Sequence, residues 1–257
     1  MANDENKTNK SETGMDPTRR RFLKNTGLVV GGVAGGSLLG GLFVNQSDGE
    51  DDSKKDKAAT PRTRGREFFA RYEDFVVLAA ATELIFPKDD NGPGAIDLDV
   101  PYFIDKQLAG TWGVNDDDYR QGPFDEKKVK EAPDTANHAR ANRGKIFLDG
   151  LRTMNAESQK RFDTTYDKAT EEQQGEIMSD LENDKLKMKT LPSSGFFALL
   201  KEATLQGAFS DPLYGGNKNM EGWKMREYPG ARASYTDLID SEDFQVLDPI
   251  SLTDYQP

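Results

Sequence analysis

The chain holds few residues whose chemistry could act on a substrate or bind a metal. Its 257 residues include one histidine, His138, and no cysteine. A histidine-rich metal site, a Ser-His-Asp triad or axial haem ligation would each depend on that one side chain. The lack of cysteine excludes disulfides, thiolate metal sites, iron–sulfur clusters and covalently attached haem. Because His138 lies in a polar stretch, we expect an exposed helical residue without a catalytic or metal-binding role.

Carboxylates are plentiful and can act as general acids and bases. Among 45 Asp and Glu residues, however, neighbours such as Asp89 and Asp90 or the run Asp116–Asp118 are expected by chance. From Asp89 onward, Asp, Asn and Gly occupy positions one, three and six of a calcium loop, but Pro93 and Val100 stand at positions five and twelve. The bidentate carboxylate of such a loop is therefore missing. No glycine-rich nucleotide-binding motif occurs, and we predict no catalytic, cofactor or metal site.

The spacing of apolar residues predicts an all-α fold, a compact helical bundle with long ordered loops. The first helix is predicted to end before Pro87, and its apolar stripe consists of Phe69, Tyr72, Val76, Ala80 and Leu84. A short helix over Val100–Leu108 is predicted to carry Pro101 in its first turn. Residues 110–133 show no periodicity, so we predict a long surface loop there.

Further along the chain, apolar clusters predict three antiparallel helices joined by short turns. Their residues are Phe147, Leu151 and Met154; Phe162, Tyr166 and Ala169 after a cap at Asn155; and Ile177 and Leu181 after Thr170. Thr170 and Gln173 have the spacing of a capping box. Another helix is predicted to begin at Pro192–Ser194 and to end near Phe209. No alternating strand pattern competes with these helices.

The N-terminal residues have the layout of a twin-arginine export signal. Its motif consists of Thr18, Arg19, Arg20, Phe22, Leu23 and Lys24. Residues 26–44 follow without an ionisable group, and seven of these nineteen are glycine, which makes the run a weak membrane span. No small-x-small cleavage site follows the run, so retention as a membrane anchor is an alternative to cleavage. A basic patch before a flexible glycine segment is the other interpretation.

Composition divides the chain into a signal or anchor (1–46), a linker (47–66), a helical domain (67–235) and an acidic C-terminal tail (236–257). Residues 1–44 hold six Lys and Arg and four Asp and Glu, so without them the formal net charge changes from −11 to −13. Nucleic-acid binding depends on Lys and Arg that neutralise phosphates. We therefore expect no nucleic-acid partner.

The most distinctive stretch, here called the signature loop, covers residues 209–231 and is rich in glycine, proline and aromatic residues. Glycine and proline at this density fix turns. The rings of Tyr214, Trp223 and Tyr228 are larger than a purely solvated loop needs. We predict an ordered loop without helical structure over Asp211–Lys224. It either caps the core of the bundle or docks a partner through its aromatic side chains.

The signature loop resembles the C-terminal signature of the gluconate 2-dehydrogenase subunit 3 (small-subunit) family, in which a helix leads into Phe-x-Asp-Pro-x-Tyr-Gly-Gly-Asn, followed by Gly-Trp-Lys and Pro-Gly-Ala. The matching residues are Phe209, Asp211, Pro212, Tyr214, Gly215, Gly216, Asn217, Gly222, Trp223, Lys224, Pro229, Gly230 and Ala231. A second match upstream comprises Ile85, Pro87, Pro93, Gly94, Ala95, Phe103, Ile104 and Asp105. The family also commonly carries a twin-arginine signal, and the resemblance spans residues 68–235.

The resemblance implies a non-catalytic small subunit of a membrane-associated, FAD-dependent sugar, polyol or gluconate dehydrogenase. In such complexes a large flavoprotein of the glucose–methanol–choline type holds FAD, and in some a cytochrome c subunit with haem c passes electrons onward. The small subunit would hold no cofactor. It would serve assembly and export, because the flavoprotein folds in the cytoplasm and crosses the cytoplasmic membrane through the twin-arginine translocase, bound to its signal-bearing partner. The expected location is the periplasm or the extracytoplasmic face of that membrane.

The resemblance implies that residues of the signature loop bind the partner. These residues are Asp211, Pro212, Tyr214, Gly215, Gly216, Asn217, Gly222, Trp223, Pro229 and Gly230. Trp223→Ala would then weaken the complex without unfolding the bundle, whereas loss of helical circular dichroism would favour the core-capping role.

Two other functions stay open: an independent exported hydrolase that uses carboxylates, and a membrane-tethered structural protein without a flavoprotein partner.

Overall fold

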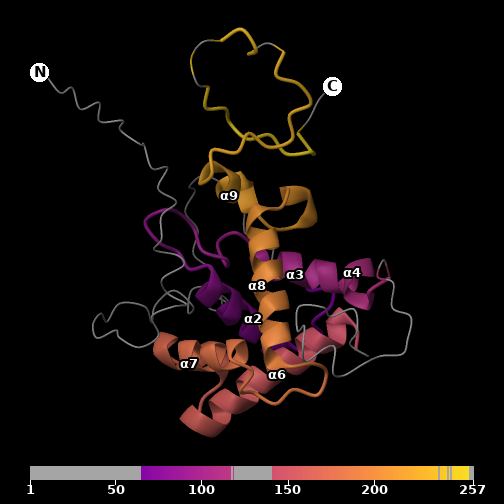
Figure 1. Cartoon of the computed structure of the whole chain (residues 1–257), viewed down its shortest axis with the longest axis vertical. Helices are drawn as coiled ribbons and strands as arrows, with labels where there is room; N and C mark the ends of the chain where they lie inside the picture. The colour runs from indigo at the N-terminus through magenta and orange to yellow at the C-terminus, as the bar shows by residue number, and fades with distance from the viewer. Residues whose placement is uncertain are drawn as a thin grey trace, which may run out of the picture. The chain divides into compact units, whose positions relative to one another are not determined.

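The computed structural model describes residues 65–116, 118, 141–236, 238–241, 243 and 245–254. The predicted export signal, nearly all of the predicted linker and His138 lie outside these ranges. The helices, shown in Figure 1, are α2 (Tyr72–Ile85), α3 (Val100–Ala109), α4 (Thr111–Val114), α6 (Arg143–Phe162), η4 (Tyr166–Lys168), α7 (Glu171–Glu182), α8 (Ser193–Phe209), η5 (Pro212–Tyr214), η6 (Lys218–Met220) and α9 (Glu221–Lys224).

The all-α prediction is confirmed, since the described ranges contain helices and two isolated backbone bridges but no strand. The bridges join Asp89 to Gly92 and Gly230 to Ile250. No helix within the same ranges is both long and apolar enough to cross a membrane.

Both helices predicted before residue 110 are present, but Phe69 of the predicted stripe lies before α2 and Tyr72 is 43% exposed. α2 ends at Ile85, before Pro87, and α3 has Pro101 in its first turn. α2 is buried more widely than the single stripe its spacing predicts, because every residue from Asp74 to Thr82 is buried. The reason is that α3, α6, α7 and α8 all contact it. The buried Asp74 carboxylate is compensated by Arg152 of α6, 2.8 Å away.

Helix α6 runs without a break through Asn155, so the predicted cap at that residue is wrong. The Asn155 side-chain oxygen instead accepts a hydrogen bond from the backbone N–H of Tyr166, at 3.0 Å. Tyr166 opens the short 3-10 helix η4, and its side chain is fully buried. Asparagine bonds readily to nearby backbone both at a cap and in such a connection, and the sequence does not separate the two cases.

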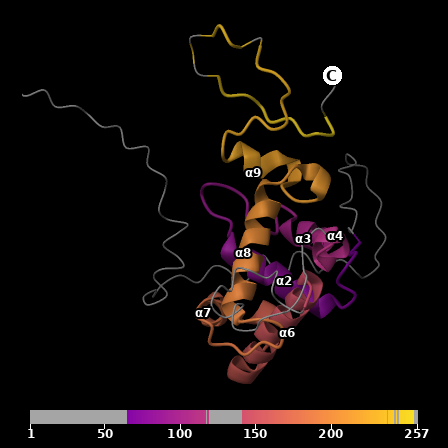
Figure 2. The same ribbon diagram turned by 45° about the vertical axis from the view of Figure 1, so that its right-hand side comes forward.

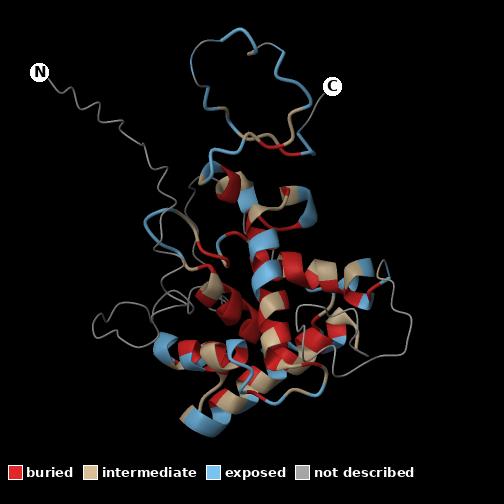
Figure 3. Cartoon of the chain, viewed as in Figure 1, coloured by how far each residue is buried: buried red, intermediate tan, exposed pale blue. Residues whose placement is uncertain are grey.

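Helices α7 and α8 agree with the sequence. Thr170 and Gln173 form the predicted capping box at the start of α7, with both reciprocal hydrogen bonds present. α8 begins at Ser193 and ends at Phe209. It is the central helix of the bundle, in contact with α2, α3, α6 and α7, as Figures 1 and 2 show. Its buried residues lie at the junction of these helices (Figure 3).

Two segments predicted as loops contain short helices. Thr111–Val114 form α4, and the signature loop contains η5, η6 and α9. The prediction that Asp211–Lys224 has no helical structure was therefore wrong. Helices of three or four residues complete about one turn, which is too short for apolar periodicity to reveal.

Asp105 of α3 fixes the segment that precedes α2. Its side chain is 1% exposed, and its two oxygens accept hydrogen bonds from the backbone N–H groups of Glu67, Phe68 and Phe69, at 2.6, 3.1 and 2.9 Å. A buried carboxylate needs such partners to offset its loss of water. The start of the described chain is thereby attached to α3 as well as to α2.

Candidate functional site

The structure brings together the two segments that carry the family resemblance. The backbone N–H of Lys218 in the signature loop donates to the carbonyl of Leu98, at 3.3 Å, and the Lys218 ammonium lies 3.7 Å from Asp99. Behind these contacts the ring of Phe86 packs edge-on against Phe209, with centroids 5.7 Å apart. The turn before α3 and the loop after α8 therefore form one continuous surface.

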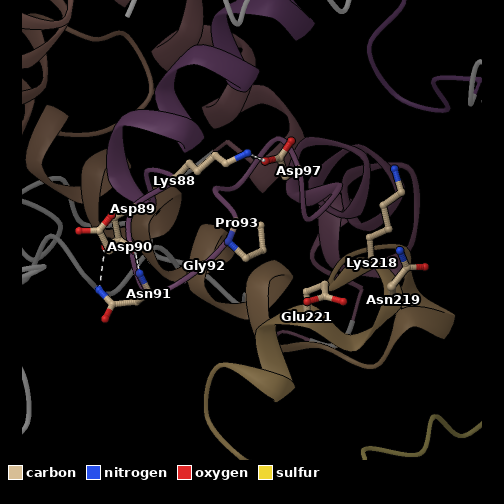
Figure 4. Close-up of a pocket in the computed structure, with 10 residues that line it drawn as sticks. All are labelled: Lys88, Asp89, Asp90, Asn91, Gly92, Pro93, Asp97, Lys218, Asn219 and Glu221. Atoms are coloured by element: carbon tan, nitrogen blue, oxygen red, sulfur yellow. Dashed lines mark hydrogen bonds and ion pairs between the residues drawn. The ribbon is translucent and has the colours of Figure 1, made fainter. Parts of the chain in front are cut away.

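An open depression of about 570 Å³ lies between these two segments (Figure 4). It is lined by Lys88, Asp89, Asp90, Asn91, Gly92, Pro93, Asp97, Lys218, Asn219 and Glu221. Lys88 pairs with Asp97 at 3.2 Å, and Glu221 pairs with Lys224 at 2.8 Å. Small-molecule and cofactor sites are usually more enclosed than this open depression.

The segment that begins at Asp89, whose composition partly matches a calcium loop, forms hydrogen bonds within itself. The backbone and side chain of Asn91 donate to the carboxylate of Asp89 (2.9 and 3.1 Å). Among the described residues no group of three His, Cys, Asp or Glu side chains has the arrangement of a metal site. Of the Asp116–Asp118 run, Asp118 forms an ion pair with Arg143 at 3.0 Å, and Asp117 lies outside the described residues.

Glu83 organises the turn that borders the depression. Its carboxylate oxygens accept hydrogen bonds from the backbone N–H groups of Lys88 (3.2 Å) and Ile96 (2.8 Å). A Cβ atom at Gly94 would overlap this carboxylate, so a larger residue there would displace Glu83 from its two backbone donors. Burial raises the pKa of Glu83 above its ordinary value, although both backbone hydrogen bonds act in the opposite direction.

Replacing Glu83 by glutamine is expected to destabilise the fold by about 1–2 kcal/mol at neutral pH. The amide NH2 of glutamine cannot accept a hydrogen bond, so one of the two backbone N–H groups would lose its acceptor. The raised pKa means that the contribution of Glu83 to stability is fully present below its ordinary pKa of about 4.3 and is lost as pH rises through the raised value. Glutamine does not titrate. The difference between variant and wild type should therefore be smaller at neutral pH than near pH ~4, which urea unfolding at both values will measure. An equal difference would contradict the raised pKa.

Asn217 is the internal anchor of the signature loop. It is fully buried, its Nδ2 donates to the carbonyl of Ser210 (2.8 Å), and its Oδ1 accepts from the N–H of Gly222 (2.7 Å). A Cβ atom at Gly222 would overlap the carbonyl of Ala208, and one at Gly216 would overlap that of Gly207. The loop therefore lies directly on the last turn of α8, at an approach that only glycine permits.

Trp223 closes the same end of the bundle. It is 6% exposed, and its indole N–H donates to the carbonyl of Phe209, the last residue of α8, at 2.8 Å. Its ring packs edge-on against Tyr228 with centroids 5.3 Å apart. Of the ten residues predicted to bind a partner, those that are buried position the loop. They are Asp211, Gly215, Gly216, Asn217, Gly222, Trp223 and Gly230.

Asp211 joins the signature loop to the C-terminal residues. Its carboxylate accepts hydrogen bonds from the N–H of Leu213 (2.9 Å), the hydroxyl of Ser251 (2.9 Å) and the N–H of Leu252 (2.8 Å). Leu213, Tyr214 and Leu252 around it are exposed, Tyr214 at 47%. We call these three residues the Asp211 face. Sequence reasoning missed Leu213, which stands at a position where the motif accepts any residue. It missed Leu252 because only the fold brings the C-terminal segment to this loop.

The described part of the chain is thus an all-α domain in which a packed, glycine-rich loop closes one end of the bundle and presents a small apolar face. Residues 72–230 match the family model described as gluconate 2-dehydrogenase subunit 3. The chain belongs to this family, which confirms the resemblance inferred from its sequence. The match begins at the first residue of α2 and ends at Gly230, so it includes both segments that meet at the depression. No curated protein and no solved structure matches the chain.

Proposed function

We propose that this chain is the non-catalytic small subunit of a membrane-associated, FAD-dependent dehydrogenase of a sugar, polyol or gluconate. Membership of the subunit 3 family is the observation that carries the proposal. FAD belongs to a large flavoprotein of the glucose–methanol–choline type, and haem c, in some complexes, to a cytochrome c subunit. The small subunit assists assembly and takes the folded flavoprotein through the twin-arginine translocase to the extracytoplasmic side.

The arrangement of the signature loop supports a docking role for its exposed part. The buried anchors Asn217 and Trp223 hold the loop rigidly on α8, and a rigid support lowers the entropy lost on binding. Aromatic and aliphatic side chains on such a support are typical interface anchors. We therefore assign partner contact to the Asp211 face and positioning to the buried residues of the loop.

Export of the flavoprotein is expected to depend on Arg19 and Arg20 of this chain. The test is co-expression of the full chain with a glucose–methanol–choline-type flavoprotein, with FAD and both proteins measured in cytoplasmic and extracytoplasmic fractions. Replacing both arginines by lysine should leave both proteins in the cytoplasm, because the receptor reads the arginine pair. Deleting this chain should leave the flavoprotein there alone.

Arg21→Lys is the matched control, because Arg21 follows the pair at a position where the motif accepts any residue. It should export both proteins normally. Export of the flavoprotein without this chain would contradict the escort role. Hydrolytic activity of the solitary chain, with no association with the flavoprotein, would favour the hydrolase alternative instead.

A further inference from the structure

The residues after the signature loop form a closed loop that projects from the bundle. At its base Ala231 N–H donates to the carbonyl of Ile250 (2.7 Å), and Ile250 N–H donates to the carbonyl of Pro229 (3.2 Å). The guanidinium of Arg232 donates to the carbonyl of Asp248 (3.0 Å). We call the described residues of 232–249 the C-terminal arm. In Figures 1 and 2 it extends beyond α9, away from the other helices.

The arm holds a defined path without a core of its own. None of its described residues is buried, and Ile239 and Val246 are 77% and 62% exposed. Local turns order it, with Leu238 N–H bonded to the carbonyl of Tyr235 and Ser241 N–H to that of Leu238 (2.9 and 3.1 Å). Ordering a loop costs conformational entropy. In this arm no buried apolar side chain offsets that cost. Long ordered loops without secondary structure of their own are often binding loops.

Charge and position indicate what the arm contacts. Residues 232–249 include five Asp and Glu and one Arg, and three of these acids, Asp240, Asp243 and Asp248, belong to the described arm. The arm is therefore repelled by an anionic membrane surface and attracted to a basic protein surface. Its base continues into the Asp211 face, because Leu252 follows the Ile250 bridge and bonds to Asp211. The arm also lies beyond residue 230, outside the part that matches the family model. The arm is therefore not part of the region shared with the family model.

We propose that the C-terminal arm is a second contact with the large dehydrogenase subunit. The arm places the apolar side chains of Ile239 and Val246 in a groove of that subunit that has a basic rim. Exposed acids such as Asp240 and Asp243 then face the rim. This inference rests on the proposed function, since it assumes that the partner is the flavoprotein.

The experiment compares full-length chains for binding to the purified glucose–methanol–choline-type flavoprotein by biolayer interferometry. The double variant Ile239→Ser, Val246→Ser is expected to bind about 10- to 100-fold more weakly, since two apolar side chains lose their burial. Val114→Ser on α4 is the matched control, because Val114 is similarly exposed at 56%, and it should bind as the wild type does. The variant Asp240→Asn, Asp243→Asn should associate more slowly at low salt and with a weaker salt dependence.

The possible results separate this inference from the proposed function. If the wild type and the variant Ile239→Ser, Val246→Ser bind the flavoprotein equally well, the arm does not contact the flavoprotein. The proposed function is then unaffected. If the wild type does not bind the flavoprotein, both the proposed function and the inference about the arm are wrong. If the chain alone is a dimer that the arm variant disrupts, the arm contacts a second copy and the inference is wrong. The proposal is supported when the wild type and Val114→Ser bind equally and the arm variant binds more weakly.

Discussion

Replacing Asp105 by alanine is expected to lower the free energy of unfolding by about 3–5 kcal/mol. The carboxylate is buried in α3 and accepts three backbone N–H groups, from Glu67, Phe68 and Phe69. Its removal leaves these donors without an acceptor, and an unsatisfied buried donor costs about 1–3 kcal/mol. The segment before α2 should also detach, which would expose the buried ring of Phe69 to water.

Urea unfolding followed by far-ultraviolet circular dichroism measures the effect. Asp97→Ala is the matched control, because Asp97 is exposed and pairs only with Lys88 at the surface. Such a pair contributes about 0–1 kcal/mol. If both variants lose the same small amount, the three hydrogen bonds to Asp105 do not fix the start of the domain.

Replacing Trp223 by alanine is expected to destabilise the protein by about 3–5 kcal/mol, the usual cost of removing a buried large aromatic side chain. Its indole N–H bond to Phe209 and its contact with Tyr228 would be lost as well. The sequence alone favoured weaker partner binding without unfolding for this variant. Because the side chain is buried, we now expect the loss of stability to come first, with any loss of binding as its consequence.

Tyr214→Ala provides the contrast within the same loop. Tyr214 is exposed on the Asp211 face, so its removal should leave the unfolding free energy within about 0.5 kcal/mol of the wild type. It should weaken binding to the flavoprotein by about 10-fold or more, as expected for an aromatic anchor. Urea unfolding and biolayer interferometry on both variants give the comparison. A Tyr214 variant that binds normally would remove the Asp211 face from the interface.

Local signals in the sequence were sufficient to predict most helices. Pro87 and Pro101 mark the end of α2 and the start of α3, and the capping box at Thr170 marks the start of α7. Each signal acts within about one helical turn, so it does not depend on the rest of the fold. Asn155 shows the limit of such signals. Its partner Tyr166 is eleven residues away, and tertiary structure decides which backbone group it meets.

The composition of the candidate site was predictable, but the sequence left two roles open for its residues, capping the core and docking a partner. The resemblance marked Asp211, Asn217 and Trp223 for partner binding, although the structure shows that all three side chains are buried and hydrogen-bonded within the domain. A shared motif does not distinguish residues that shape a loop from residues that touch a partner. Burial makes this distinction, and it depends on contacts such as that between Asp211 and Leu252, which lie far apart in sequence.

The attachment of the first described residues to Asp105 has a mechanical consequence. Tension on the chain before residue 65 reaches the N–H groups of Glu67–Phe69 and passes through Asp105 to α3. α3 in turn lies so close to α8 that a side chain at Gly207 would overlap the ring of Phe103. Three hydrogen bonds therefore connect this segment to α3, which packs closely against the central helix α8. On the proposed export route, force on the N-terminal segment would therefore act on α3 and α8, and we expect the domain to stay folded while the flavoprotein crosses the membrane.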